Sequence, residues 1–125
     1  MASKDVADWM DRYLRAWSSN DPSDIGGLFT DDARYYTAPH RQPWSGREEI
    51  AREWIDRKDD PGTWDFRWEE LARAGDLAFV RGWTSYRGQE PVEYSNLWVI
   101  RMEGDRCSEY TEWWMDVPAG EKSST

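Results

Sequence analysis

The segment EYTEWWMD, residues 109–116, places carboxylates directly beside two tryptophans. If this segment is a β-strand, alternate side chains share a face, so Glu112 lies on one face with Tyr110 and Trp114. A carboxyl group held against indole and phenol rings loses hydration, which raises its pKa and permits proton exchange near neutral pH. Glu112 is therefore our candidate for general acid or base. The structural alternative is an ion pair with Arg81, which would lower the pKa instead.

Four other side chains carry groups suited to the same chemistry. Tyr13 supplies the one phenol in an apolar helical stripe, and it could donate to an oxyanion or simply bond to a backbone carbonyl. Asn96 could stabilise an enolate or alkoxide, or orient a neighbouring group. His40 is the only histidine; it titrates near neutral pH and could act as a reserve base, or remain solvated in its Pro-flanked loop. Arg81 interrupts the apolar strand LAFVRGW and could anchor an anionic substrate, although Gly82 next to it could mark a bulge that changes its face.

Composition excludes several classes of function. The net charge of −9 argues against nucleic acid, because binding phosphates requires a basic surface. The chain has no long apolar run for a membrane span and no secretory signal at its start. A single cysteine, Cys107, suits a reducing cytoplasm. One histidine, one cysteine and dispersed acids show no metal-ligand spacing, and no phosphate loop is present, so we expect neither a metal nor a cofactor.

Patterning predicts one α+β domain over residues 1–125, with a frayed tail from about 118. Apolar residues at helical spacing predict a helix from Asp5 to Ser19, and Asp21 suits the N-cap of a second helix. Ser45 and Glu48 suggest a capping box for a third. After Asp60 the turn signals at Gly75-Asp76, Gly88 and Gly104-Asp105 separate four strand candidates, which predict an antiparallel meander.

Ten tryptophans exceed what a small two-layer core easily absorbs, so some of them should line a cavity or an interface. The run Leu97-Trp98-Val99-Ile100 is apolar at both odd and even positions, which point to opposite faces of a strand. This pattern indicates a strand that is covered on both faces. The helices can cover only one face of the sheet. We therefore expect a homodimer that buries the other face.

Three stretches together resemble the SnoaL-like family of the nuclear transport factor 2-like superfamily: YLRAWSSNDPSDIGGLFTDDARYYTAP, SGREEIAREWI and YSNLWVIRMEGDRCSEYTEWWM. The resemblance implies a cone-shaped, curved antiparallel sheet wrapped around a pocket that three N-terminal helices close, usually in a dimer. Relatives include polyketide cyclases, ketosteroid isomerases, epoxide hydrolases, dehydratases and non-catalytic binding domains. Function must therefore be argued from the site.

The resemblance also implies which side chains face the pocket. It places Glu112 on the inner face, with Ser108 on the same face of its strand, and Tyr13 where the isomerases keep an oxyanion-binding phenol. The isomerases' catalytic aspartate is absent, because Thr37 or Ala38 stands in its place. SnoaL-like cyclases carry an acid on a late strand, for which Glu112 is the candidate. The expected substrate contacts are Trp17, Tyr36, Arg81, Trp98, Tyr110 and Trp114.

The resulting hypothesis is a cofactor-free enzyme that acts on a hydrophobic or aromatic small molecule by cyclisation, isomerisation or dehydration. An epoxide hydrolase is a narrower alternative, and a second acid facing the pocket would favour it. A non-catalytic binding module would be favoured by an arginine on Glu112 and a backbone bond from Tyr13. A dimerisation domain would be favoured by a cone filled with side chains.

Overall fold

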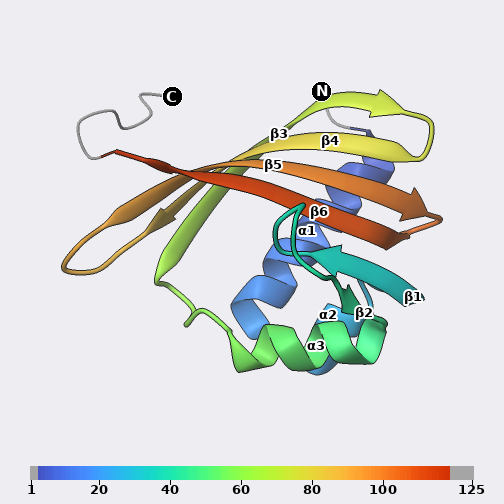
Figure 1. Cartoon of the computed structure of the whole chain (residues 1–125), viewed down its shortest axis with the longest axis horizontal. Helices are drawn as coiled ribbons and strands as arrows, with labels where there is room; N and C mark the ends of the chain where they lie inside the picture. The colour runs from blue at the N-terminus through green and yellow to red at the C-terminus, as the bar shows by residue number, and fades with distance from the viewer. Residues whose placement is uncertain (1–2, 119–125) are drawn as a thin grey trace.

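A computed structural model describes residues 3–118 and shows a six-stranded sheet with helices on one side of it (Figure 1). The predicted tail from about 118 falls almost entirely on residues outside this range. None of the described helices is long and apolar enough to cross a membrane. The elements in chain order are α1 (Lys4–Ser19), α2 (Pro22–Gly26), β1 (Phe29–Tyr36), β2 (Trp44–Ser45), α3 (Arg47–Asp56), β3 (Trp64–Ala74), β4 (Leu77–Tyr86), β5 (Val92–Glu103) and β6 (Arg106–Val117).

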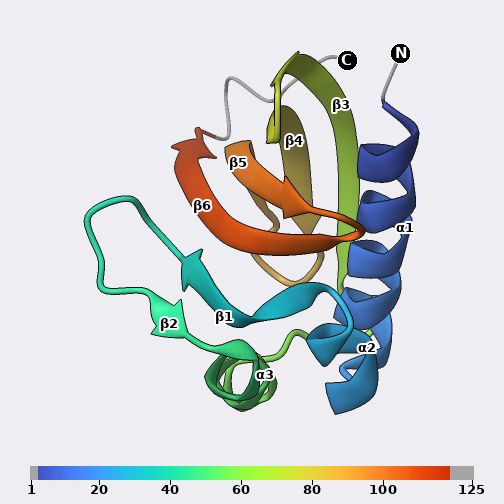
Figure 2. The ribbon, with the colours of Figure 1, turned by 90° about the vertical axis from the view of Figure 1, so that its right-hand side faces the viewer.

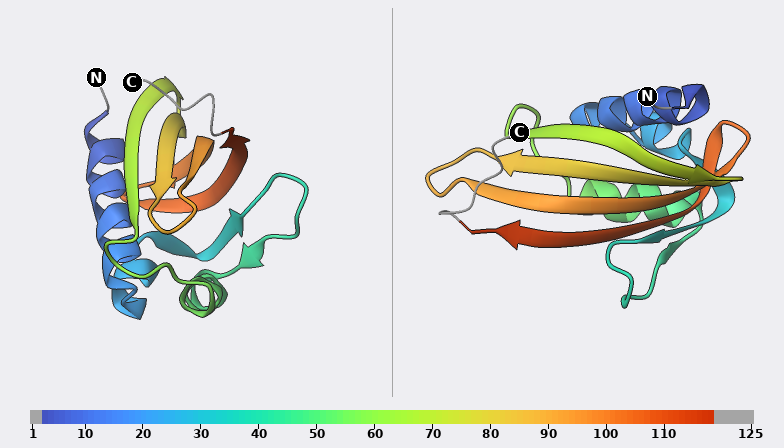
Figure 3. Two further views of the ribbon diagram at one scale, coloured as in Figure 1. Left: turned by 90° about the vertical axis from the view of Figure 1, so that its left-hand side faces the viewer. Right: turned by 90° about the horizontal axis from the view of Figure 1, so that it is seen from above.

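The sheet is curved and unclosed, with the strand order β2-β1-β6-β5-β4-β3 (Figures 2 and 3). Strands β3 to β6 form the predicted antiparallel meander. One pairing departs from the expected antiparallel sheet, because β1 runs parallel to β6. The α+β cone is otherwise confirmed, and its concave side faces α1 and α3 (Figure 2).

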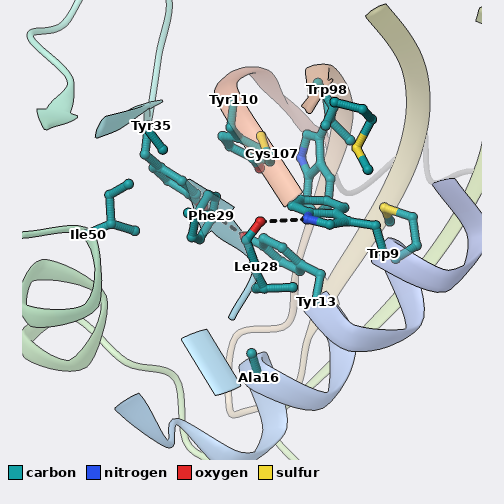
Figure 4. Close-up of a cluster of buried hydrophobic side chains, with 14 of the residues drawn as sticks. Trp9, Tyr13, Ala16, Leu28, Phe29, Tyr35, Ile50, Trp98, Cys107 and Tyr110 are labelled. Carbon is teal, nitrogen blue, oxygen red and sulfur yellow. Dashed lines mark hydrogen bonds between the residues drawn. The ribbon is translucent and has the colours of Figure 1, made fainter. Parts of the chain in front are cut away.

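Helix α1 begins one residue earlier than predicted and buries one face against the sheet. Trp9 is fully buried, and its indole N–H donates to the carbonyl of Leu28 at 2.9 Å, which ties the helix to the segment before β1 (Figure 4). The helix ends at Ser19. The next residue, Asn20, has a left-handed φ of 51°, and its N–H returns to the carbonyl of Ala16. This geometry is a common helix stop that asparagine tolerates.

The starts of α2 and α3 depend on different residues. Asp21 caps α2 as predicted, accepting from the Ser23 backbone N–H at 2.7 Å. The capping box predicted for α3 is wrong. Ser45 belongs to β2, and Gly46 is the N-cap with a φ of 88°. A shifted contact replaces the box, since the backbone N–H of Ser45 donates to Glu49 at 2.7 Å.

The inner faces of β5 and β6 follow the predicted alternation, except at the start of β6. There Cys107 pairs with Met102, whereas Glu109 pairs with Arg101, so β6 carries one extra residue between them. Cys107 is consequently fully buried, and Ser108, predicted to share the inner face, is only half-buried. The bulge reverses which side chains of β6 face inward, but only before Glu109. The strand is regular from there through Glu112 and Trp114.

The convex face of the sheet carries apolar side chains that no described helix covers. Trp113 and Met115 are 43% and 66% exposed there. Leu97 and Val99, one strand away, are half-buried. The expected second subunit would cover this face, and that expectation stays a prediction.

Candidate active site

A cavity of about 380 Å³ opens on the concave side of the sheet, between the strands, α1, α3 and the segment after α3. Nine of the fifteen described residues that line it are aromatic, so its walls are mainly rings. Trp17, Trp98 and Trp114 are among them, and Trp114 lies 45% exposed. A concave, mostly apolar space with a few convergent polar groups is the usual form of a small-molecule site.

Glu112 faces this cavity from β6, opposite Trp98 on β5. Its Oε2 accepts two hydrogen bonds, from the Asn96 amide at 2.8 Å and from the Trp98 indole N–H at 3.0 Å. No lysine or arginine in the described part of the chain forms a salt bridge with it. Burial raises the pKa of the Glu112 carboxyl, and the two hydrogen bonds offset only part of that rise.

Arg81 is not the partner of Glu112, and it lies outside the cavity. It is exposed on the convex face, 3.8 Å from Glu69, with its guanidinium 4.8 Å from the centre of the Trp83 ring. The bulge considered at Gly82 is absent, because Gly82 pairs in register with both neighbouring strands. The side chain of Arg81 therefore points outward. Both roles considered for it, the ion pair with Glu112 and contact with a substrate in the cavity, were wrong.

Asn96 orients Glu112 rather than standing free to bind an oxyanion. Its amide N–H₂ donates to Glu112, and its Oδ1 accepts from the Thr84 hydroxyl at 2.7 Å. Thr84 and Asn96 are 4% and 7% exposed. The amide is thereby fixed with its donor toward the carboxylate, and Thr84 is a positioning residue that sequence reasoning missed.

Two phenols from different elements meet at the wall of the cavity. The hydroxyls of Tyr13 on α1 and Tyr35 on β1 lie 2.7 Å apart, in a buried hydrogen bond (Figure 4). Burial raises the pKa of Tyr13 and of Tyr35 well above the ordinary value, so both stay protonated donors. The backbone bond considered for Tyr13 is not present, since its partner is this second phenol.

Tyr35, and not the predicted Tyr36, is the tyrosine of β1 that contributes to the cavity. Tyr35 lines the cavity and is 6% exposed, whereas Tyr36 is half-buried and does not line it. Tyr110, another predicted contact, is fully buried beneath the cavity, with its ring centre 4.2 Å from that of Tyr35. It supports the wall and does not reach the space.

A second acid, Asp59, lines the cavity from the connection between α3 and β3. Its Oδ2 accepts from the Trp17 indole N–H and from the Tyr86 hydroxyl, both at 3.1 Å. Its backbone carbonyl accepts from Asn20 at 3.0 Å, which holds the connection near the end of α1. Asp59 stands in the turn-like stretch RKDDPG, where an acid is expected to face solvent, so no signal in the sequence distinguished it.

His40 does not join the site. It is exposed in the loop between β1 and β2 and does not line the cavity, which removes it as a reserve base. Within residues 3–118, no three His, Cys, Asp or Glu side chains cluster closely enough to hold a metal ion.

The curved sheet and its helices share the fold of solved ketosteroid isomerase-like and NTF2-like proteins. The family model of the SnoaL-like domain matches residues 10–110, and the chain belongs to that family. No curated protein matches the chain.

Solved structures share the fold at low sequence identity. A protein with a ketosteroid isomerase-like fold from Catenulispora acidiphila, in complex with trimethylamine, is 21% identical with a TM-score of 0.64, covering 84% of this chain and 83% of that one. An epoxide hydrolase from M. tuberculosis, described as LEH-like, is 13% identical with a TM-score of 0.68, covering 90% and 84%. A ketosteroid isomerase-like protein from Erwinia carotovora is 20% identical with a TM-score of 0.62, covering 87% and 92%.

Proposed function

We propose that this protein is a cofactor-free enzyme that moves a proton on a hydrophobic small molecule in the aromatic cavity. One observation carries the proposal. Both hydrogen bonds to Glu112 end on Oε2, which leaves Oε1 without a partner among the described residues, in a buried carboxyl group that lines the cavity. A carboxyl group held in place, partly dehydrated and not neutralised by a cation is suited to general acid/base work.

The two phenols supply the second half of the chemistry. When Glu112 removes a proton from carbon, negative charge develops on a substrate oxygen. Only one hydrogen of the Tyr13–Tyr35 pair is used between the two hydroxyls, so the other is available to that oxygen. Return of the proton from Glu112 to another atom completes an isomerisation. In a ring closure the carbanion attacks a carbonyl, and Glu112 then returns its proton to the new alkoxide. We place this protein among the isomerases and cyclases of its family on this basis.

The two non-enzymatic alternatives have less support. A purely structural dimerisation domain would have a cone filled with side chains, whereas this cone contains a cavity of about 380 Å³. If the protein were a passive binding module, we would expect an arginine paired with Glu112 and a hydrogen bond from Tyr13 to the backbone. Neither contact occurs within the described residues. The Catenulispora structure with bound trimethylamine supports small-molecule binding by this fold.

Epoxide hydrolysis is the second candidate, and Asp59 favours it. Two acids, Glu112 and Asp59, line the cavity, as a water-activating pair would require, and the M. tuberculosis epoxide hydrolase shares the fold. No arginine bridges the two acids within the described residues, because Arg57 pairs with Glu53 and Asp56 and Arg81 lies on the convex face. Hydrolysis of styrene oxide to its diol by the purified protein, lost in both Glu112→Gln and Asp59→Asn, would establish this activity in place of proton transfer on carbon.

We expect the proposed enzyme to be a cytoplasmic homodimer. The lone, buried Cys107 supports a reducing compartment. Exposed Trp113 and Met115 on the convex face support a sheet-to-sheet dimer. Sedimentation of Trp113→Asp beside the wild type tests the dimer, since a charge at a buried interface should release monomers.

A chromogenic carbon acid tests the proposed chemistry without knowledge of the natural substrate. The probe is 5-nitrobenzisoxazole: a base removes its C3 proton, the N–O bond breaks, and a coloured cyanophenolate forms. We expect the wild type to accelerate this elimination and Glu112→Gln to slow it by about 100-fold or more. Glu103→Gln removes an exposed acid from the end of β5 and is the matched control, with unchanged rate. Equal rates for wild type and Glu112→Gln would overturn the proposal.

A further inference from the structure

Three hydrogen-bond donors on the cavity walls are occupied by the two acids of the cavity. The indole N–H of Trp98 is bonded to Glu112. The indole N–H of Trp17 and the hydroxyl of Tyr86 are both bonded to Asp59. A ligand close to these acids therefore meets ring faces and the carboxyl oxygens of Glu112 and Asp59 that accept no hydrogen bond within the described residues.

Two cationic residues line the same cavity but do not neutralise these acids. Arg57 and Lys58 are both exposed. Arg57 is engaged by Glu53 and Asp56, and its guanidinium lies 5.7 Å from the centre of the Trp44 ring. Neither residue forms a salt bridge with the two cavity acids within the described chain. The positive charge of the cavity lining thus lies toward solvent, and no cation pairs with the two acids within the described residues.

We propose that the ligand is an organic cation, namely a protonated amine carried on an aromatic or aliphatic body. Its ammonium N–H would donate to the free oxygen of Glu112, while its body lies among the rings of Trp17, Trp54 and Trp114. Ring faces attract cations electrostatically, most strongly in a desolvated site, and an ammonium–carboxylate hydrogen bond is about twice as strong as a neutral one. This inference rests on the proposed function and names the class of its substrate.

A cationic ligand would also act on the base itself. Burial raises the pKa of the Glu112 carboxyl, which favours its neutral form in the empty cavity. A positive charge beside the carboxyl favours the ionised form and opposes that effect. The ammonium group would therefore hold Glu112 as a carboxylate, and the second lone pair of Oε1 would be left to accept a proton from carbon.

Three probes of one shape test the charge requirement: 2-phenylethylamine as the cation, 2-phenylethanol as the neutral isostere, and 3-phenylpropanoate as the anion. Binding is followed by calorimetry and by quenching of tryptophan fluorescence. We expect the amine to bind about tenfold more tightly than the alcohol, and the anion more weakly than either. Equal affinities for amine and alcohol, or tighter binding of the anion, would overturn the inference.

Variants assign the preference to the cavity rather than to the overall net charge of −9. Glu112→Gln should reduce the amine-to-alcohol ratio to about one, whereas Glu103→Gln should keep it. Asp59→Asn should reduce it less, since Asp59 is already held by two donors. A ratio that survives in both Glu112→Gln and Asp59→Asn would show that the cavity acids do not select the ligand, and the inference would fail.

The two proposals fail in different ways. If the wild type accelerates elimination of 5-nitrobenzisoxazole but binds amine and alcohol equally, the acid/base function stands and the amine inference falls. If the wild type prefers the amine but elimination is unaffected by Glu112→Gln, the cavity is a cation-binding site without the proposed chemistry.

Discussion

The amide of Asn96 donates to the Glu112 carboxylate at 2.8 Å across the β5–β6 pair, while its oxygen is held by Thr84 at 2.7 Å from the far side. The three side chains thus form a chain of hydrogen bonds that runs over three adjacent strands. Its effect is to aim one carboxylate and to define which of the two carboxylate oxygens is free. The geometry of the site depends on this chain as much as on Glu112.

The first prediction concerns Thr84, the far end of that chain. Thr84→Val keeps the shape but removes the hydroxyl that fixes the amide oxygen of Asn96, so the N–H₂ donor is held less firmly toward Glu112. Losing the donor disfavours the carboxylate, so the pKa of Glu112 should rise further. The acid limb of the pH–rate profile for 5-nitrobenzisoxazole should shift upward, with a stability loss of about 1 kcal/mol.

Thr84→Ser restores a hydroxyl and should restore the wild-type profile. Titration of carbon-labelled glutamate by NMR reads the same shift without turnover. An unchanged profile in Thr84→Val would show that Asn96 is oriented by packing alone.

The second prediction concerns stability and pH. Burial holds the pKa of folded Glu112 above its ordinary value of 4.5, so between those two values the native state binds more protons than the unfolded state. Stability from this residue is therefore lost as pH rises through that window. Glu112→Gln should unfold at a higher urea concentration than the wild type at pH 7, and the difference should shrink below pH 4.5.

Urea titrations from acid to neutral pH measure this difference, with Glu103→Gln as the control for removal of one negative charge. A Glu112→Gln variant that is less stable than the wild type at neutral pH would mean that the two hydrogen bonds to the carboxylate outweigh its lost hydration.

Local patterns were enough to predict much of the fold and the direction of Glu112. Helix α1 and the meander follow from apolar spacing and from turn residues, which act within a few positions along the chain. Glu112 could be placed because β6 has no bulge between Tyr110 and Trp114, where its register with β5 is continuous.

The errors arose where strand pairing, rather than local sequence, decides which way a side chain points. Tyr35 and Tyr36 are chemically alike, and only the position of β1 beside β6 selects Tyr35 for the cavity. The face of Arg81 depended on whether Gly82 forms a bulge, and the pairing on both sides of Gly82 excludes one. Asp59 lies in a connection whose path depends on its tertiary contacts. A shift of one residue moves a side chain to the other face, so such errors are complete rather than partial.

The third prediction concerns the two phenols. Tyr13→Phe and Tyr35→Phe each keep a ring but remove one hydroxyl, and each should lower kcat by about 100-fold on a probe whose oxygen becomes negative. Because the two hydroxyls act as one hydrogen-bonded unit, the double variant should lose little more than either single one. Multiplicative losses in the double variant would indicate two independent donors.

The fourth prediction concerns Gly82, where two strands leave room for a ring. A Cβ at this position would lie 2.5 Å from the Phe66 ring, which in turn stacks on Trp98 with 4.8 Å between ring centres. Gly82→Ala should therefore push Phe66 toward Trp98, the residue that donates to Glu112, at a cost of about 1–3 kcal/mol. Chemical denaturation measures the cost, and the pH–rate profile shows whether the donor has moved.

Shortening the ring tests the cause of this cost. The double variant Gly82→Ala/Phe66→Leu should be more stable than the sum of its single changes predicts, because leucine leaves space for the new methyl group. Ala78→Gly alters a buried alanine on the same strand without contact of this kind, so Phe66→Leu should not rescue it. Strict additivity of Gly82→Ala and Phe66→Leu would mean that the glycine is required for its backbone and not for the room it gives to Phe66.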